Sequence, residues 1–307
     1  MTDAPGPSEQ AGFRSGYVAI VGRPNAGKST LLNALLGQKL SIVSGKPQTT
    51  RHKILGILNE PGVQAVFMDT PGLIRPKYLL QTMMMKSVRS SLQDADLTLF
   101  LRDVTERPAA DERKAEAEIL GGIPTAVIVV LNKTDLSNDG EVNAVAAQFE
   151  GSSRPTGAIL RVSALTGSGL DRLKAEIVRR LPLHPPYFPA DSLSDQNERF
   201  FVAEIIREKV FDCYREEIPY STTVRILAFE EKKGRKDLIE AEICVERESQ
   251  KGILIGVKGA ALKKTGQLAR KDIEQFLGRG VFLELRVKVR PKWRDDRVWL
   301  KRLGYSD

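Results

Sequence analysis

The sequence predicts two folded parts: an α/β domain with a mostly parallel sheet and helices on both faces, followed by a smaller α+β domain. Three observations predict this order. A glycine-rich loop joins an apolar run to a helical segment, and strand-like runs then alternate with helical patterns up to residue 182. A proline-rich stretch follows, after which the rhythm changes. At 307 residues, the chain is long enough for two such domains.

The glycine-rich loop has the pattern of a phosphate-binding loop. Residues 22–29 read G-x-x-x-x-G-K-S, between the apolar run 17–21 and a helical segment. The glycines allow consecutive N–H groups to face a phosphate at the positive end of a helix. We expect Lys28 to reach the β- and γ-phosphates and the Ser29 hydroxyl to bind Mg²⁺. The expected phosphate-binding residues are Gly22, Arg23, Pro24, Asn25, Ala26, Gly27, Lys28, Ser29 and Thr30.

A polar loop after another apolar strand indicates the base. Asn132-Lys133-Thr134-Asp135 directly follows the run 126–131, and parallel sheets bind ligands at the carboxyl ends of their strands. The Asp135 carboxylate can accept hydrogen bonds from guanine N1–H and the 2-amino group. Adenine lacks both donors and would leave the carboxylate unpaired. We expect Asn132 to hold the purine edge and Lys133 to lie along the base.

Two more loops, each after an apolar run, complete the expected nucleotide site. In Ser163-Ala164-Leu165, the Ala164 N–H would cap the guanine. In Asp69-Thr70-Pro71-Gly72, we expect Asp69 to hold Mg²⁺ through water and the Gly72 N–H to meet the γ-phosphate.

The remaining expectations concern hydrolysis. A threonine hydroxyl of Thr49-Thr50 can join the Mg²⁺ shell when the γ-phosphate is present, and we favour Thr50 over Thr49. Signalling GTPases usually carry a glutamine after the glycine of the Asp-Thr-Pro-Gly loop, to orient the attacking water. That position is Leu73, which cannot hydrogen-bond to water, so we expect slow hydrolysis. Lys28, Thr50 and Gly72 are the expected catalytic residues, with charge neutralisation from Lys28 and Mg²⁺.

These five motifs, in this order, resemble the translation-factor class of regulatory GTPases and predict a P-loop GTPase domain that binds GTP and GDP. Asn25 resembles a residue that coordinates a monovalent cation in related GTPases. Two interpretations remain open: a K⁺ ligand that replaces an arginine finger, or an asparagine that structures the loop.

The proline-rich stretch marks the domain boundary. Four prolines in residues 182–189 cannot continue a helix and favour an extended linker. The expected organisation is a disordered tail at 1–15, the GTPase domain at 16–182, the linker at 183–195, and a second domain at 196–307.

Composition favours a soluble cytoplasmic protein. The sequence has no apolar stretch of membrane-spanning length, and its N-terminus is not signal-like. Cys213 and Cys244 are widely separated, so we expect free thiols and no zinc.

The second domain has its own pattern. Apolar residues recur at helical spacing over 200–214 and form an expected core stripe. Strand-like runs at 222–229 and 239–245 flank a polar hairpin tip, and a closing strand with a basic alternating face is expected at 281–289.

Between these strands lies a G-x-x-G turn that joins two short helical pieces. Its glycines would admit a sugar–phosphate backbone. The order helix, strand, strand, G-x-x-G, helix, strand is typical of a KH module of the bacterial type (type II). The expected RNA-binding residues are Ile253, Ile255, Gly256, Val257, Lys258, Gly259, Lys263 and Lys264.

Charge distribution supports a polyanion partner. Residues 251–307 carry a net charge of +9, whereas residues 183–250 carry −5. A basic surface can be merely solubilising, and a G-x-x-G can occur in any helix–turn–helix corner. Together they favour a nucleic acid.

The chain resembles the Era-like family of bacterial GTPases from about residue 17 to residue 305. The stretches that carry the resemblance are 22–29, 47–52, 69–72, 251–259 and 300–305, and residues 45–48 depart from it. The resemblance implies an assembly factor for the small (30S) ribosomal subunit that binds the 3′ end of 16S rRNA. It also implies loose association with the cytoplasmic membrane, for which the sequence shows no anchor.

Two other functions are weighed against this one. In the first, the basic domain of a GTPase docks on an anionic membrane or a protein partner. The second, a tRNA-modifying GTPase, needs a catalytic cysteine setting that neither cysteine has. We expect no DNA partner and a monomer.

Overall fold

The structure is a computed structural model that describes residues 12–150 and 157–305. Within these ranges, it divides into two units. The first unit comprises residues up to 41 together with 50–75 and 84–195, and the second comprises residues 42–49, 76–83 and those from 196 onward. The second unit therefore includes two short segments from the N-terminal half of the chain.

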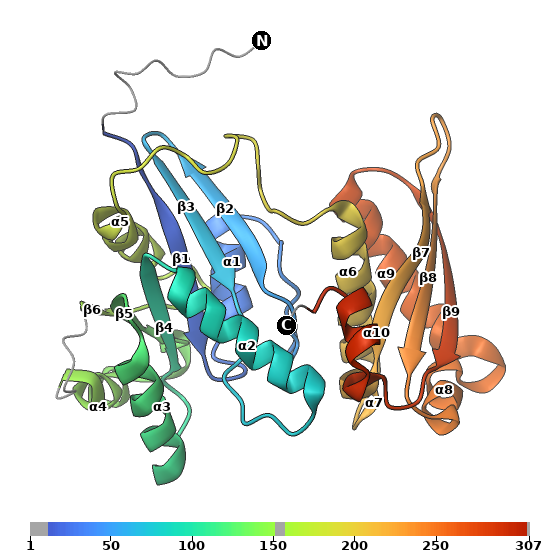
Figure 1. Ribbon diagram of the computed structural model, residues 1–307, viewed down its shortest axis with the longest axis horizontal. Coiled ribbons are helices and arrows are strands. Elements are labelled where there is room, and N and C mark those ends of the chain that lie inside the picture. Colours follow the sequence, from blue (N-terminus) through green and yellow to red (C-terminus); the bar gives the residue numbers. More distant parts are fainter. Residues whose placement is uncertain (1–11, 151–156, 306–307) are drawn as a thin grey trace. The chain divides into compact units, whose positions relative to one another are not determined.

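A six-stranded sheet forms the centre of the first unit, because its apolar runs are long enough for strands and are buried on both faces. The strand order is β2-β3-β1-β4-β5-β6, and only the β2–β3 pair is antiparallel (Figure 1). The strands are β1 (Arg14–Gly22), β2 (Ile54–Glu60), β3 (Val63–Asp69), β4 (Leu97–Asp103), β5 (Ala126–Asn132) and β6 (Ala158–Arg161).

Helices cover this sheet. The apolar cluster on one face joins the sheet to α2 and α4, and α1 packs on β2, β3 and α5. The helices are α1 (Lys28–Leu36), α2 (Leu79–Asp94), α3 (Ala110–Gly122), the short 3-10 turn η2 (Thr134–Leu136), α4 (Asp139–Glu150) and α5 (Leu170–Arg180). The carboxyl ends of β1, β3, β5 and β6 carry the loops predicted to bind the nucleotide.

Both ends of the first unit are more ordered than the sequence indicated. Strand β1 begins at Arg14, whose N–H donates to the Gly62 carbonyl at 3.0 Å, so the expected tail at 1–15 is too long by two residues. Residues 1–11 of that tail lie outside the described residues. The expected linker lies along the sheet: the Ile57 N–H donates to the Leu193 carbonyl at 2.9 Å. Gln64 accepts hydrogen bonds from the N–H groups of Tyr187 and Phe188. The bond from Ile57 satisfies an N–H on the outer edge of β2, which would otherwise be unpaired.

A three-stranded sheet of order β7-β8-β9 forms the second unit, with β8 and β9 parallel (Figure 1). Alternate residues of β8 are buried against α6, α8 and α9. The elements are α6 (Glu198–Cys213), α7 (Ile218–Ser221), β7 (Thr223–Glu230), β8 (Asp237–Val245), α8 (Glu248–Ile255), the turn η3 (Val257–Gly259), α9 (Ala260–Leu277), β9 (Val281–Val289), the turn η4 (Trp293–Asp295) and α10 (Arg297–Arg302).

Two helices of the second unit differ from expectation. The helix after the G-x-x-G turn is not short, because α9 continues for 18 residues with Thr265, Ala269 and Ile273 buried on one face. Helix α6 buries charged side chains beside its apolar stripe.

No helix within the described residues is both long and apolar enough to cross a membrane.

Candidate nucleotide-binding site and nucleic-acid interface

Close contacts explain the glycines of the phosphate loop. Gly27 has φ 95°, and a Cβ there would lie 2.3 Å from Asn132 Nδ2. Gly22 has φ 156°, and a Cβ there would lie 2.5 Å from the Leu101 carbonyl oxygen. Side chains at these positions would force the loop away from β4 and β5.

Lys28 is buried at the start of α1. Its ammonium donates to the carbonyls of Gly22 at 3.1 Å and Arg23 at 2.8 Å. Burial lowers the pKa of Lys28 to about 8, and the nearby Asp69 carboxylate partly opposes that shift. A buried ammonium that donates to backbone carbonyls fits a role as a phosphate ligand, because an anion would compensate its desolvation.

Three oxygen side chains meet beside Lys28, where the sequence places Mg²⁺. The Ser29 hydroxyl lies 2.8 Å from the Thr50 hydroxyl and donates to Asp69 Oδ2 at 2.8 Å. The other carboxylate oxygen of Asp69 is buried and has no hydrogen-bond partner in the described part of the chain. Burial raises the pKa of Asp69, and the Lys28 charge opposes this rise. An orphaned oxygen beside two hydroxyls fits a hard cation that also binds phosphate oxygens.

Thr49 and Thr50 are distinguished by their contacts. The Thr49 hydroxyl donates to the Lys46 carbonyl at 2.7 Å, away from Ser29. Only the Thr50 hydroxyl lies beside Ser29. Thr50 is therefore the better candidate for an Mg²⁺ ligand.

The Asp-Thr-Pro-Gly loop packs against the phosphate loop. The Thr70 hydroxyl donates to the Ile20 carbonyl at 2.8 Å, and a Cβ on Gly72 would lie 2.8 Å from the Pro24 backbone. Pro71 is buried, and Leu73 packs against the apolar cluster of the sheet. Leu73 thus has a packing role in the position where signalling GTPases orient water.

Asn132 links two of the loops that the sequence assigns to the nucleotide. Its amide N–H donates to the Ala26 carbonyl at 2.8 Å, and its side-chain oxygen accepts the Ala164 N–H at 3.0 Å. Asn132 therefore joins the phosphate loop to the Ser163-Ala164-Leu165 loop. The guanine cap by the Ala164 N–H remains a prediction.

Lys133 has a carboxylate partner, since its ammonium lies 2.6 Å from Asp103 Oδ2. Asp135, in the same loop, is exposed. A carboxylate that recognises a base must be accessible in this way. Ser163 is buried and accepts the Thr166 N–H at 3.1 Å, whereas Leu165 is 80% exposed. The exposed Leu165 side chain is available to cover a purine face.

The other loop residues have separate roles. Arg23 pairs with Glu112 at 2.8 Å and Glu106 at 3.3 Å, contacts that join the phosphate loop to α3 and that sequence reasoning missed. Asn25 is exposed with φ 62°, a conformation that asparagine tolerates well. Ala26 is buried, and Thr30 is half-buried.

The G-x-x-G turn of the second unit is a sharp left-handed corner. Gly256, Lys258 and Gly259 have φ of 69°, 50° and 79°. A Cβ on Gly256 would lie 2.7 Å from the Ala261 Cβ, so only glycine lets the turn pack on α9. Val257 at its tip is 83% exposed. The turn therefore presents backbone and charge to solvent.

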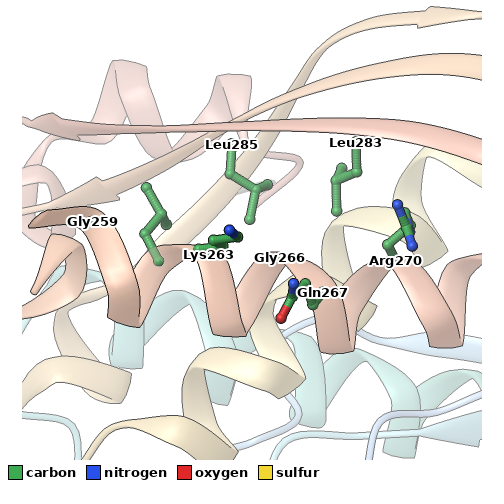
Figure 2. A pocket seen from close by; sticks show the side chains of 8 residues that line it. Gly259, Lys263, Gly266, Gln267, Arg270, Leu283 and Leu285 are labelled. Atoms are coloured by element: carbon green, nitrogen blue, oxygen red, sulfur yellow. The ribbon is translucent and has the colours of Figure 1, made fainter.

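A groove with a volume of about 430 Å³ lies between α9 and β9, next to this turn (Figure 2). Leu283 and Leu285 reach from β9 toward α9, which contributes Lys263, Gln267 and Arg270 (Figure 2). Gly259, Leu262 and Gly266 complete the lining. Sequence reasoning named Gly259 and Lys263 but missed the other residues of this lining, although the glycine inside α9 was a signal.

Gly266 keeps the groove open. A Cβ at this position would lie 3.3 Å from Leu285 Cδ1, closer than most side chains tolerate. Glycine costs about 1 kcal/mol in a helix interior relative to alanine. The groove thus has an apolar floor with amide and cationic groups on its rim, which suits a base with its backbone outside.

The predicted RNA-binding residues differ in how exposed their side chains are. Ile253, Lys263 and Lys264 are exposed, and Ile255 is half-buried. The expected basic face of the closing strand is partly neutralised: Arg286 lies 2.8 Å from Glu284, and Lys288 lies 3.9 Å from Glu242. On α9, Arg270 lies 3.9 Å from Glu274, whereas Lys263 and Lys264 have no carboxylate partner within residues 12–150 and 157–305.

Comparisons with known proteins cover almost the whole chain. Residues 17–133 match the MMR_HSR1 family, described as 50S ribosome-binding GTPase, and residues 217–294 match the KH domain family KH_2. The chain is 48% identical over 295 residues to the GTPase Era of Geobacter metallireducens, spanning 96% of this chain and 98% of that protein.

Two solved structures are similar over both units. A variant of Aquifex aeolicus Era bound to GDP and aluminium fluoride matches with a TM-score of 0.91 at 40% identity. Era in complex with MgGDPNP and nucleotides 1506–1542 of 16S ribosomal RNA also matches with a TM-score of 0.91 at 40% identity. Each match covers 96% of this chain and 100% of the other.

Proposed function

Because the chain belongs to the Era family of GTPases, we propose that it binds the 3′ end of 16S rRNA and assists assembly of the small ribosomal subunit. The chain is a GTPase that uses GTP, GDP and Mg²⁺. We propose a switch in which GTP orders the loops around Thr50 and Gly72, and hydrolysis releases them.

One observation carries this proposal: a single chain contains both a triphosphate–Mg²⁺ site and an open groove beside a G-x-x-G turn. The similar Era structure holds MgGDPNP and 16S rRNA nucleotides together. The MMR_HSR1 description names the 50S subunit, but that match covers only residues 17–133. Residues from 196 onward lie outside it, so we assign the partner from the full-length match.

The division of labour follows from the two sites. We propose that residues 16–182 bind and hydrolyse GTP and that residues 196–307 bind RNA. We also propose that the protein is a monomer in the cytoplasm. Peripheral contact with the membrane and K⁺ binding at Asn25 belong to the same proposal. The left-handed backbone of Asn25 also supports the loop-structuring alternative.

Hydrolysis would depend on charge and position. Lys28 and Mg²⁺ would neutralise charge that develops on the phosphates, with Ser29, Thr50 and Asp69 holding the metal. The half-buried Leu73 offers no group to orient water, so the reaction would be slow without a partner.

The testing experiment is binding of a labelled single strand that matches the 3′ end of 16S rRNA. The protein is loaded with a non-hydrolysable GTP analogue, with GDP or with neither, at two salt concentrations. We expect sequence-selective binding that is tighter in the GTP-analogue state. Equal, weak binding that salt abolishes in every state would overturn the proposal, because generic charge attraction behaves in that way.

A variant locates the RNA contact. Gly259→Asp adds a carboxylate where a Cβ meets no atom within 4 Å, and aspartate tolerates the left-handed backbone. RNA affinity should fall at least tenfold through charge repulsion, while GTP affinity stays unchanged. Anionic vesicles provide the other arm: vesicle binding with RNA affinity retained in this variant would indicate membrane docking.

A further inference from the structure

Lys133 has a backbone conformation that is unusual for a lysine. Its φ is 64° and its ψ is 35°, in the left-handed region that glycine and asparagine enter more readily. Residues held in this region cluster at binding sites, where neighbouring contacts keep them in place. We therefore traced which contacts hold Lys133, all of them within the first unit.

Backbone hydrogen bonds fix the chain on both sides of Lys133. On one side, the Asn132 carbonyl accepts the Val104 N–H at 3.1 Å. On the other side, the Val162 carbonyl accepts the Thr134 N–H at 3.3 Å and the Thr134 hydroxyl at 3.0 Å. The loops after the adjacent strands β4, β5 and β6 thus meet at this lysine. They hold its backbone, but they leave its flexible side chain without a fixed direction.

The Asp103 carboxylate supplies that direction. Asp103 ends β4, opposite Asn132 in the register with β5, and it is 3% exposed. Its Oδ2 lies 2.6 Å from the Lys133 ammonium. Its Oδ1 accepts the Thr105 N–H at 2.8 Å and the Thr105 hydroxyl at 2.6 Å. Because both oxygens are engaged, the carboxylate cannot turn away from Lys133 without losing the two hydrogen bonds from Thr105.

This ion pair orders the lysine before a nucleotide binds. A mobile lysine would lose rotamer freedom when a base packs on it, and that loss would weaken binding. A lysine stem can pack on an apolar face while its ammonium binds elsewhere. The Lys133 side chain remains 31% exposed although its ammonium is paired, so a purine can still reach it.

We propose that Asp103 is a positioning residue for guanine nucleotides, acting through the Lys133 ammonium to hold the lysine stem along the base. The inference rests on the proposed role of Lys133 at the base. Asparagine is a matched probe at position 103, because it keeps the size of aspartate and removes the charge that holds the ammonium. The phosphate contacts of Lys28 come from another loop and should not depend on Asp103.

The test compares Asp103→Asn with Asp94→Asn, an exposed aspartate before β4 that accepts the Ser90 hydroxyl at 3.1 Å. For Asp103→Asn, we expect GDP affinity to fall about tenfold and the KM for GTP to rise about tenfold, as the lysine loses its order. The kcat should change less than about twofold, since Lys133 meets the base and not the γ-phosphate. Asp94→Asn should match the parent protein.

Tripolyphosphate with Mg²⁺ is the probe that separates positioning from general damage to the site. It has phosphates but no base, so its affinity should be the same in Asp103→Asn and in the parent protein. A loss of tripolyphosphate affinity equal to the loss of GDP affinity would overturn the inference. Unchanged GDP affinity in Asp103→Asn would overturn it as well.

A double-mutant cycle tests whether Asp103 acts through Lys133. In a Lys133→Met background, Asp103→Asn should cause no further loss of GDP affinity, because both changes remove one interaction. Additive losses would mean that Asp103 acts by another route and would contradict the inference. If Lys133→Met alone leaves GDP affinity unchanged, the proposed role of Lys133 fails, and the inference fails with it.

A milder variant covers the case in which Asp103→Asn does not fold. Thr105 is exposed, and Thr105→Val removes the hydroxyl that binds Asp103 while keeping the side-chain shape and the backbone N–H. GDP affinity should fall about threefold, as the loss of one hydrogen bond can cause, and Lys133→Met should abolish this difference. Parent-like GDP affinity in the folded Thr105→Val protein would exclude the positioning role.

Discussion

The hydroxyl oxygens of Ser29 and Thr50 lie 2.8 Å apart, although Ser29 lies in the first turn of α1 and Thr50 in the loop before β2. Neighbouring ligands of an octahedral Mg²⁺, with bonds of about 2.1 Å, are about 3 Å apart. The two oxygens therefore already have a separation that suits one magnesium ion.

We expect Ser29→Ala to weaken binding of a GTP analogue at least tenfold in the presence of Mg²⁺, because the hydroxyl is lost from the metal shell. In EDTA, the variant and the parent protein should bind equally. Titration calorimetry under both conditions checks this. A loss of the same size in EDTA would mean that the serine supports the loop rather than the metal.

Asp135→Asn should change the base that the protein accepts. The carboxylate can accept two hydrogen bonds from guanine, whereas asparagine presents a donor to the same edge. We expect the affinity for GTP to fall about a hundredfold or more, with a gain for xanthosine triphosphate, whose edge carries an acceptor. Competition with a fluorescent nucleotide measures both, and unchanged preference for GTP would remove Asp135 from base recognition.

Nucleotide affinity should depend on Lys28 above pH 8. Burial lowers the pKa of Lys28 to about 8 in the folded chain, and a bound phosphate favours the protonated form. As pH rises above 8, binding must take up a proton, so affinity should fall by up to about tenfold per pH unit. Calorimetry at pH 8.5 in two buffers of different ionisation enthalpy counts that proton, and Lys28→Met should abolish the uptake.

The same group has the opposite effect on the nucleotide-free fold. Its depressed pKa means that the unfolded chain binds more protons than the folded chain above pH 8 and up to the ordinary lysine pKa of 10.5. The Lys28 contribution to the free energy of unfolding therefore rises with pH across that window. Denaturant unfolding of parent and Lys28→Met proteins at pH 8 and 9.5 isolates it, and a parent-minus-variant difference that falls with pH would contradict the assignment.

Gly72→Ala should separate binding from hydrolysis. The added Cβ would lie 2.8 Å from the Pro24 backbone, so the loop must shift away from the γ-phosphate position. We expect kcat to fall about a hundredfold, as a displacement of about 1 Å can cause, with GDP affinity within twofold. Gly121→Ala, where a Cβ meets no atom within 4 Å, is the control. An unchanged kcat would exclude Gly72 from the reaction.

Gly266→Ala should weaken RNA binding by narrowing the groove against Leu285. Alanine is a better helix former than glycine. The free energy of unfolding should therefore fall by no more than the close contact with Leu285 costs. We expect RNA affinity to drop several-fold with GTP hydrolysis intact. Gly252→Ala in α8, with open space around its Cβ, should leave RNA affinity unchanged. Equal RNA affinity in both variants would mean that no RNA base binds in this groove.

Local motifs made much of the molecule predictable. The phosphate loop, the Asp135 loop and the G-x-x-G turn depend on backbone conformations and residue types within a few positions. The closing strand spans residues 281–289, as its alternation predicts. Only glycine fits the close approach at Gly27, so the pattern itself carries the geometry.

Side-chain partners far apart in sequence were not predictable. The Asn132 amide is engaged by Ala26 and Ala164, although the motif alone assigned it to the purine. Arg286 and Lys288 count as basic in the sequence, but on the neighbouring strand β8 they meet Glu240 at 3.8 Å and Glu242 at 3.9 Å. Pairing depends on strand register, which alternation within one strand does not define.

The sequence by itself therefore determined the chemistry: a phosphate loop that needs glycine and lysine, a carboxylate for guanine, and a glycine turn for a polyanion. Only the tertiary structure decided which partners those groups have. It placed Thr50 beside Ser29 and opened the groove at Gly266. The physical reason is distance along the chain, because hydrogen bonds and packing act over a few ångströms between residues that the fold alone brings together.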